Sequence, residues 1–256
     1  MKGEIGMENT EKPLIIYEMA NNHQGSLFHG RSIIKELAKV SIDKNFDYAI
    51  KFQYRDLDSF IHPDYKNRMD LKFVKRFSTT KLEDDDYLAL IHECRKNNFK
   101  VICTPFDEAS VKKIVKHKYD FIKIASCSIK DWPLIEEISK AGLPVIASTA
   151  GVGLDDIDKV VSFFNHRNIE LAIMHCVGVY PTENKDLFLN RLDFIRERYD
   201  NIRVGFSTHE RPGVLSPVLM AVAKGASIFE KHVGLEDKDN NITLNEYSCN
   251  PGQVLE

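Results

Sequence analysis

The chain has 256 residues, 43% of them hydrophobic, which is enough to bury one large core in a single domain. Its 35 basic and 38 acidic side chains give a net charge of -3, so there is no electrostatic reason to expect nucleic acid or an acidic membrane as partner. No apolar run reaches a membrane-spanning length, and nothing near the start resembles a signal peptide. We therefore expect a cytoplasmic protein that binds small molecules.

The five cysteines are odd in number, and no two have the short spacing of a zinc knuckle or a redox pair. Reduced thiols are therefore expected, in agreement with a cytoplasmic location. The charged residues 1–13 are expected to be a leader, and residues 14–256 are expected to form one catalytic domain.

Short β-branched or aromatic runs alternate along the chain with longer segments of helical periodicity. This is the pattern of repeated βα units around a parallel sheet. The expected strands are 14–18, 47–53, 100–104, 121–125, 144–148, 171–175, 202–207 and 226–232. Eight strands in this pattern predict an α/β fold, the closed (β/α)8 or TIM barrel.

Helix-start signals follow several of these runs. Helices are expected to begin near Ser26, Asp107, Asp131 and Leu154, and 82–97 has the pattern of an amphipathic helix. The polar stretch 54–80 is expected to be a long loop with some helix of its own, and loops of this length are often functional.

Only residues 233–256 follow the eighth strand, and Asn250 with Pro251 gives a late helix-start signal. The last outer helix is therefore expected to be truncated, because about six residues cannot hold a stable isolated helix. We expect either a longer polypeptide or a partner that covers this side of the barrel.

Catalytic groups of such barrels gather at the carboxyl ends of the strands. Polar residues end every expected strand. They are Glu18, Lys51, Gln53, Thr104, Lys123, Ser126, Ser148, Thr149, His175, Ser207, His209, Glu230, Lys231 and His232.

Lys51 and Lys123 lie within apolar runs, where a charge is costly unless it is paired or meets a ligand. Each lysine either pairs with a barrel carboxylate such as Glu18 or Glu230, or both converge on an anion. Neighbouring serine and threonine hydroxyls, and backbone amides near Gly151, could donate to phosphate oxygens, which favours the anion.

His209 and His232 end the seventh and eighth expected strands, which are neighbours in a closed barrel. Their imidazoles could bind one divalent ion, although either alone is more readily explained as a structural histidine. Glu18, on the adjacent first strand, would supply a third ligand or a base. Cys176 beside His175 carries little weight as a nucleophilic pair, because adjacent strand residues point to opposite faces.

Characteristic motifs lie in order along the chain. They are EMANNHQGS at 18–26, IKFQ at 50–53, TPFD at 104–107, KIAS at 123–126, STAG at 148–151, HCVGVYPT at 175–182, GFSTH at 205–209 and EKH at 230–232. Through these motifs the chain resembles, from Leu14 to Pro251, the sialic acid synthase family, in which a barrel of this kind condenses phosphoenolpyruvate with N-acetylmannosamine or a related sugar.

The resemblance implies roles for individual residues. The catalytic group would be Glu18, Lys51, His209 and His232. The phosphoenolpyruvate contacts would be Lys51, Thr104, Lys123, Ser126, Ser148, Thr149 and Ser207. The sugar would contact Asn22, Gln53, Tyr180 and His232. A divalent metal, Mn²⁺ or Mg²⁺, would be bound by His209 and His232.

Several departures from the family pattern fall on the sugar side. Gly178 stands where the family usually has Asn, and Thr208 where it has Asp. Cys127 with Ser128 replaces a Gly followed by an acidic residue, Ala150 replaces Gly, and 243–251 lacks an Asp-His pair. The family's C-terminal domain, which resembles antifreeze protein and caps the partner's site with an arginine in a homodimer, is expected to be absent from residues 1–256.

These departures leave three functions open. The first is a synthase that makes a nonulosonic, sialic-type acid from an N-acetylmannosamine-like aldehyde. The second is a synthase for another ulosonic acid with a different aldose, and the third is a non-catalytic binding module of a larger glycan-assembly protein. Phosphoenolpyruvate and an amino sugar are the expected small-molecule substrates, and a homodimer or a longer polypeptide is the expected context.

Overall fold

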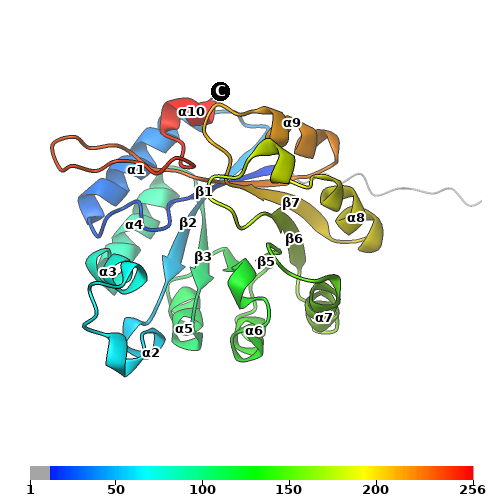
Figure 1. The fold of residues 1–256 in the computed structure, drawn as a ribbon, viewed down its shortest axis with the longest axis horizontal. Helices are drawn as coiled ribbons and strands as arrows, with labels where there is room; N and C mark the ends of the chain where they lie inside the picture. The colour runs from blue at the N-terminus through cyan, green and yellow to red at the C-terminus, as the bar shows by residue number, and fades with distance from the viewer. Residues whose placement is uncertain (1–11, 256) are drawn as a thin grey trace, which may run out of the picture.

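The computed structural model describes residues 12–255, which form a closed barrel of eight parallel strands in chain order (Figure 1). The strands are β1 (Leu14–Glu18), β2 (Asp47–Tyr54), β3 (Lys100–Pro105), β4 (Phe121–Ile124), β5 (Val145–Ser148), β6 (Leu171–Cys176), β7 (Arg203–Thr208) and β8 (Ile228–His232). Because β1 pairs with both β2 and β8, the barrel closes. The predicted TIM barrel is confirmed, and the strands differ from their expected ranges only at their ends. Residues 1–11 of the expected leader lie outside the described part.

Helices follow the strands and surround the barrel (Figure 1). They are α1 (Leu27–Val40), α4 (Asp84–Lys96), α5 (Glu108–Lys116), α6 (Trp132–Ser139), α7 (Leu154–Asn165), α8 (Asn190–Arg198), α9 (Ser216–Ala223) and α10 (Pro251–Leu255). The expected caps are confirmed, because the side chains of Ser26, Asp107 and Asp131 each accept a hydrogen bond from a first-turn amide.

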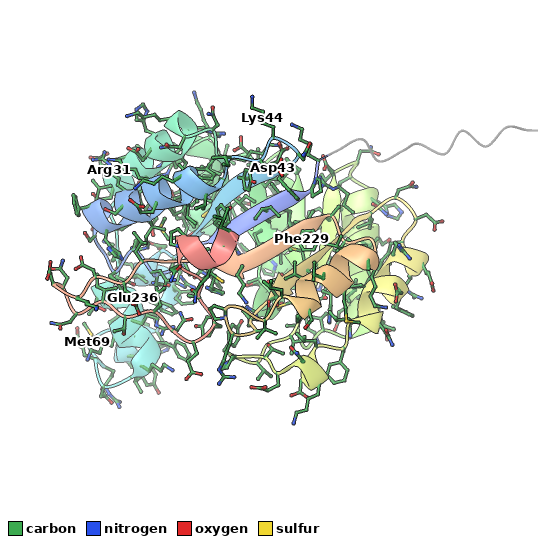
Figure 2. All side chains as sticks on the ribbon, turned by 90° about the horizontal axis from the view of Figure 1, so that it is seen from above. Arg31, Asp43, Lys44, Met69, Phe229 and Glu236 are labelled. Atoms are coloured by element: carbon green, nitrogen blue, oxygen red, sulfur yellow. The ribbon has the colours of Figure 1, made fainter. Side chains whose placement is uncertain are left out.

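The expected excursion between β2 and α4 contains α2 (Leu57–Phe60), the 3₁₀ turn η1 (Pro63–Tyr65) and α3 (Lys72–Thr79). Figure 2 shows Met69 of this excursion and Glu236 of the loop after β8 on the same side of the molecule. The predicted long loop with short helices is therefore confirmed.

The short helix α10 packs against α1, and Val254 contacts the hydrophobic core. Asn250 and Gln253 exchange two hydrogen bonds of 3.0 Å between side chain and backbone at its start. A helix of this length depends on such packing, since its own hydrogen bonds are few.

Each strand is buried on both faces, which explains the nearly continuous apolar runs. One cluster of apolar side chains packs between the barrel and its helices. A second, smaller cluster fills the barrel interior, and includes Leu14, Ile16, Ala49, Ile102, Ile146, Ala172, Met174 and Ile228. The inward positions of the strands are thereby fixed, which determines where the polar strand ends point.

No helix within residues 12–255 is both long and apolar enough to cross a membrane. Over the same residues, no disulfide joins any of the cysteines, as expected for reduced thiols.

His23, in the loop between β1 and α1, is buried at 2% exposure and accepts a hydrogen bond of 3.1 Å from the Gly25 amide through Nδ1. Burial and the neighbouring His29 lower the pKa of His23 from 6.5 to about 4. As the pH falls below 6.5, the unfolded chain takes up a proton that the folded chain excludes, so stability is lost.

We predict that acid destabilises the wild-type protein more steeply than the variant His23→Asn, which keeps an amide acceptor but does not titrate. The free energy of unfolding should fall by up to about 1.4 kcal/mol more per pH unit between about pH 6 and 4.5. Urea denaturation at several pH values measures both slopes, and equal slopes would contradict the shifted pKa.

Candidate active site

A layer of polar side chains lies at the carboxyl end of the barrel interior. In every strand, the residue two positions after an inward apolar residue or glycine points to the same side, because strand side chains alternate. These pairs are Ile16 and Glu18, Ala49 and Lys51, Ile102 and Thr104, Phe121 and Lys123, Ile146 and Ser148, Met174 and Cys176, Gly205 and Ser207, and Ile228 and Glu230. On each strand, the inward-facing residue of the polar layer therefore comes directly after the inward-facing residue of the apolar layer.

Two lysines and two glutamates pair at the centre of this layer. Lys51 contacts Glu18, which the strand register places opposite it, and also lies 2.9 Å from Glu230 Oε2. Lys123 donates to both oxygens of Glu230 at 3.1 and 3.0 Å. Ser207, opposite Glu230 in the β7–β8 register, donates to Oε1 at 3.0 Å. The two positive and two negative charges balance in a buried cluster.

Burial opposes the charge of all four groups, but its outcome differs among them. It raises the pKa of Glu18, and the charge of Lys51 does not fully offset this. Burial would also raise the pKa of Glu230, but Lys123 and Lys51 together hold it well below its usual range. Burial lowers the pKa of Lys123, despite Glu230. Glu18 is therefore the carboxylate that accepts a proton more readily.

The pairing of the lysines with barrel carboxylates was one of the two alternatives that the sequence left open. Glu230 was expected only as such a partner, and its central position among three donors was missed. A signal for it exists, because Glu230 follows the inward Ile228 by two residues in a run that is otherwise apolar up to that point.

Two buried hydroxyls point into the same layer without a partner. Thr104 Oγ1 and Ser148 Oγ have no hydrogen bond within the described residues, although the side chains are only 2% and 4% exposed. Leaving a buried hydroxyl unsatisfied costs about 1–3 kcal/mol, so such groups commonly mark a place where a ligand binds. Both are among the expected phosphoenolpyruvate contacts.

Two other hydroxyls of that expected set are already used by the backbone. Thr149 donates to the Met174 carbonyl at 3.0 Å, because it faces away from the inward Ser148. Ser126 Oγ accepts from the Ala150 amide at 2.9 Å and so joins the loops after β4 and β5. The structure does not bring the Thr149 hydroxyl into the central cluster.

His209 and His232 lie together, with ring centroids 5.4 Å apart. His209 Nδ1 must donate to the Val177 carbonyl at 2.9 Å, which leaves Nε2 with a lone pair for a metal. Burial lowers the pKa of His209 to about 4 and that of His232 well below its usual range, so both rings are neutral at pH 7. Neutral, oriented imidazoles are what a divalent ion requires.

The imidazole nitrogens of His209 and His232 suit a transition-metal ion such as Mn²⁺ better than Mg²⁺, which prefers oxygen ligands. Within residues 12–255 no group of three or more His, Cys, Asp or Glu side chains is arranged to hold a metal. Glu18, considered as a third ligand, instead contacts Lys51 and accepts from Gln53 Nε2 at 3.3 Å. Substrate or water oxygens would have to complete the coordination.

The expected sugar contacts lie around this centre. Gln53 contacts Glu18, and the Tyr180 ring lies 4.0 Å from that of His209. The Asn22 amide instead donates to the Val233 carbonyl at 2.7 Å. Beside Gln53, a pocket of about 280 Å³ opens between the end of β2, the excursion and α4. Gln53 lines this pocket, but neither Glu18 nor Glu230 does, so the pocket adjoins the central cluster only through Gln53.

Sequence reasoning missed Tyr247, whose ring lies 5.1 Å from those of His232 and Tyr180. It belongs to the segment 243–251, which was singled out for the Asp-His pair that it lacks. The signal available in the sequence was the presence of an aromatic residue in this segment.

Residues 39–254 match the model of the NeuB family. The chain belongs to the NeuB family. Synthases of this family form a carbon–carbon bond with phosphoenolpyruvate, so the chain is an enzyme of the sialic acid synthase type, a transferase. The resemblance stated from the motifs is thereby confirmed.

Several relatives match this NeuB barrel over nearly its whole length. A Methanocaldococcus jannaschii protein without an assigned function is 31% identical, over 96% of this chain and 69% of its own. N-acetylneuraminate-9-phosphate synthase of Drosophila melanogaster is 30% identical over 94% of this chain and 64% of its own. Pseudaminic acid synthase of Campylobacter jejuni is 28% identical over 94% and 72%. The chain spans about two thirds of the length of these relatives.

Two solved structures agree with the barrel. A Chromobacterium violaceum protein assigned to spore coat polysaccharide biosynthesis superposes with a TM-score of 0.92 at 50% identity, over 95% of this chain and 72% of its own. N-acetylneuraminic acid synthetase from Leptospira borgpetersenii gives a TM-score of 0.82 at 28% identity, over 96% and 81%.

The unpartnered hydroxyls lead to a prediction about stability. Thr104→Val removes a hydroxyl without a partner and keeps the side-chain shape, so the free energy of unfolding should be unchanged or rise by up to about 1 kcal/mol. Ser207→Ala is the matched control: it removes the donor to Glu230 and should lower the free energy of unfolding by about 1–3 kcal/mol. Urea denaturation measures both, and equal losses would mean that the Thr104 hydroxyl is structural.

Proposed function

We propose that this NeuB barrel condenses phosphoenolpyruvate with an N-acetylmannosamine-like aldose to give a nonulosonic, sialic-type acid and phosphate. The observation that carries the proposal is the central cluster, in which Lys51 and Lys123 lie beside two unpartnered hydroxyls and below two neutral imidazoles. An anionic donor and a polarised aldehyde are the two reactants that this combination suits.

The lysines and hydroxyls would bind the donor. Phosphoenolpyruvate carries a phosphate and a carboxylate, and its negative charge can replace the carboxylates that now hold the lysines. Thr104 and Ser148 would then donate to its oxygens, which gives both hydroxyls the partner that they lack. Lys51 and Lys123 would remain to stabilise the phosphate as it departs.

The reaction then joins the methylene carbon of the enol to the aldehyde carbon, while the aldehyde oxygen takes up a proton. Water adds to the resulting cationic carbon and loses one proton. The hydroxyl so formed gives its remaining proton to the departing phosphate as the bond between that carbon and the phosphate oxygen breaks, which leaves the keto group of the product. A divalent ion held by His209 and His232, for which we propose Mn²⁺, would polarise the aldehyde oxygen as a Lewis acid.

Glu18 is placed to handle the protons. Burial raises the pKa of Glu18 above its usual value, which favours a group that can hold a proton and release it again. Gln53 donates to its Oε1, which fixes the orientation of the carboxylate beside the expected sugar contacts. We therefore assign Glu18 the role of general base or acid for the water and the aldehyde oxygen.

The acceptor is the finer part of the proposal. The named relatives include an N-acetylneuraminate-9-phosphate synthase and a pseudaminic acid synthase, whose products differ in the sugar-derived part. An aldose other than N-acetylmannosamine would make the chain a synthase of a different ulosonic acid. We also propose a cytoplasmic enzyme that acts as a homodimer or within a longer polypeptide.

The test is phosphate release from phosphoenolpyruvate and Mn²⁺ in the presence of N-acetylmannosamine, its 6-phosphate, mannose and other aldoses. We expect phosphate release to depend on the presence of an aldose. Mass spectrometry should then show a product that contains the carbon atoms of both phosphoenolpyruvate and the aldose. Binding of phosphoenolpyruvate without release for any sugar would favour a non-catalytic binding module instead.

The metal assignment gives a separate prediction. His209→Ala should weaken Mn²⁺ binding by at least about tenfold, because only His232 would remain among the proposed protein ligands. His166→Ala, which removes an exposed histidine on the far end of α7, is the control and should leave Mn²⁺ affinity unchanged. Titration calorimetry checks both, and unchanged affinity in His209→Ala would remove this residue from the site.

A further inference from the structure

Two tyrosines from different loops meet beside the paired histidines. Tyr180 follows β6 and lies against His209, while Tyr247 follows β8 and lies edge-on to His232 with an interplanar angle of 85°. The two tyrosine rings are 5.1 Å apart. Tyr180 is 52% exposed, so the aromatic surface is open to solvent at the mouth of the barrel. An apolar wall therefore borders an otherwise polar centre.

Contacts of the residues that follow Tyr247 hold its segment of backbone in place. The Cys249 amide donates to the His232 carbonyl at 2.8 Å and thus joins this segment to the end of β8. The hydroxyl of Ser248 accepts from the Asn22 amide at 3.2 Å. These contacts fix the backbone next to Tyr247 relative to His232, so the ring forms a built surface.

Two cations near these rings, Arg211 and Lys231, are already paired with carboxylates. Arg211 donates to Glu183 and Glu246 at 2.8 Å each, which connects the loops that follow β6, β7 and β8. Lys231 lies 3.1 Å from Glu210 Oε1. These two cations are therefore already neutralised, and the rings of Tyr180 and Tyr247 are the surface offered beside the histidines.

Gly178, two residues before Tyr180, contributes no side chain, and residues 243–251 contain no Asp-His pair. A hydroxyl pressed against the two rings would lose water without gaining a partner, whereas a methyl or a C–H face would not. The surface thus favours apolar parts of a sugar.

We propose that Tyr247 determines acceptor specificity: with Tyr180 it forms an aromatic wall that selects an aldose with an acylated amino group next to the reacting aldehyde. This inference rests on the proposed function, since it assumes that the aldehyde carbon approaches His209 and His232. The acyl methyl and the adjoining C–H face would then pack on the tyrosine rings.

The experiment compares binding of N-acetylmannosamine with that of mannose, which carries a hydroxyl in place of the acetamido group. Saturation-transfer NMR with phosphoenolpyruvate and Mn²⁺ present gives both affinities without requiring turnover. In the wild-type protein N-acetylmannosamine should bind more tightly. Tyr247→Ala should reduce this preference about three- to tenfold, and Tyr247→Phe should retain most of it because the ring remains.

Phe194→Ala is the matched control, because it removes a partly exposed ring on α8, away from the histidines, and should preserve the preference. Phosphoenolpyruvate affinity, measured by calorimetry, should change less than about twofold in every variant. Tyr247→Leu, which keeps apolar volume but loses the ring, provides the same comparison if Tyr247→Ala does not fold.

The outcomes separate this inference from the proposed function. An unchanged sugar preference in Tyr247→Ala or Tyr247→Leu overturns the wall, as does wild-type protein that binds both sugars equally or neither. Selective sugar binding that depends on Tyr247, without phosphate release, supports the wall and contradicts the proposed condensation.

Discussion

The ion-paired cluster at the carboxyl end of the barrel constrains the rest of the site. Glu18, Lys51, Lys123 and Glu230 come from four strands, and any one of them buried alone would be costly. The β1–β2 register places Glu18 opposite Lys51, and the β7–β8 register places Ser207 opposite Glu230. The hydrogen-bonded register of the barrel therefore also determines which charges neutralise each other.

Such a cluster is poorly explained by stability alone. Well-packed apolar side chains in the same place often stabilise a protein as much as a buried ion pair, or more. Here the layer below is apolar, and the polar layer contains two hydroxyls without partners as well as charges. A balanced cluster with spare donors can exchange an internal carboxylate for a substrate anion. Stability is then partly given up for a site that is ready to bind.

Sequence reasoning predicted the barrel because the apolar runs, the helix-start signals and the alternation of strand and helix patterns all favour the same fold. It also placed Glu18, Lys51, Lys123 and His232 at strand ends, since strand periodicity is local. It could not decide whether the lysines pair internally, because that depends on contacts across the barrel between β4 and β8. The inward position of Glu230 could be read from its spacing to Ile228, although its several partners could not.

Loop residues were harder to predict than strand residues. Tyr247 reaches the histidines because a backbone bridge between Val233 and Cys249 folds its segment back to β8. No local pattern encodes that bridge. Thr149 was grouped with Ser148 by proximity in the sequence, yet its hydroxyl donates to the Met174 carbonyl. Alternation of side chains along a strand separates such neighbours.

A crystal structure with phosphoenolpyruvate and Mn²⁺ tests the central claim most directly. The account predicts that the Nζ atoms of Lys51 and Lys123 lie within hydrogen-bonding distance of donor oxygens, and that Thr104 and Ser148 donate to the same molecule. At least one contact between a lysine and Glu230 should lengthen beyond about 4 Å, the limit of an ion pair, because the lysine exchanges the carboxylate for the substrate anion. Phosphoenolpyruvate bound elsewhere, with all four ion-paired side chains unmoved, would contradict the account.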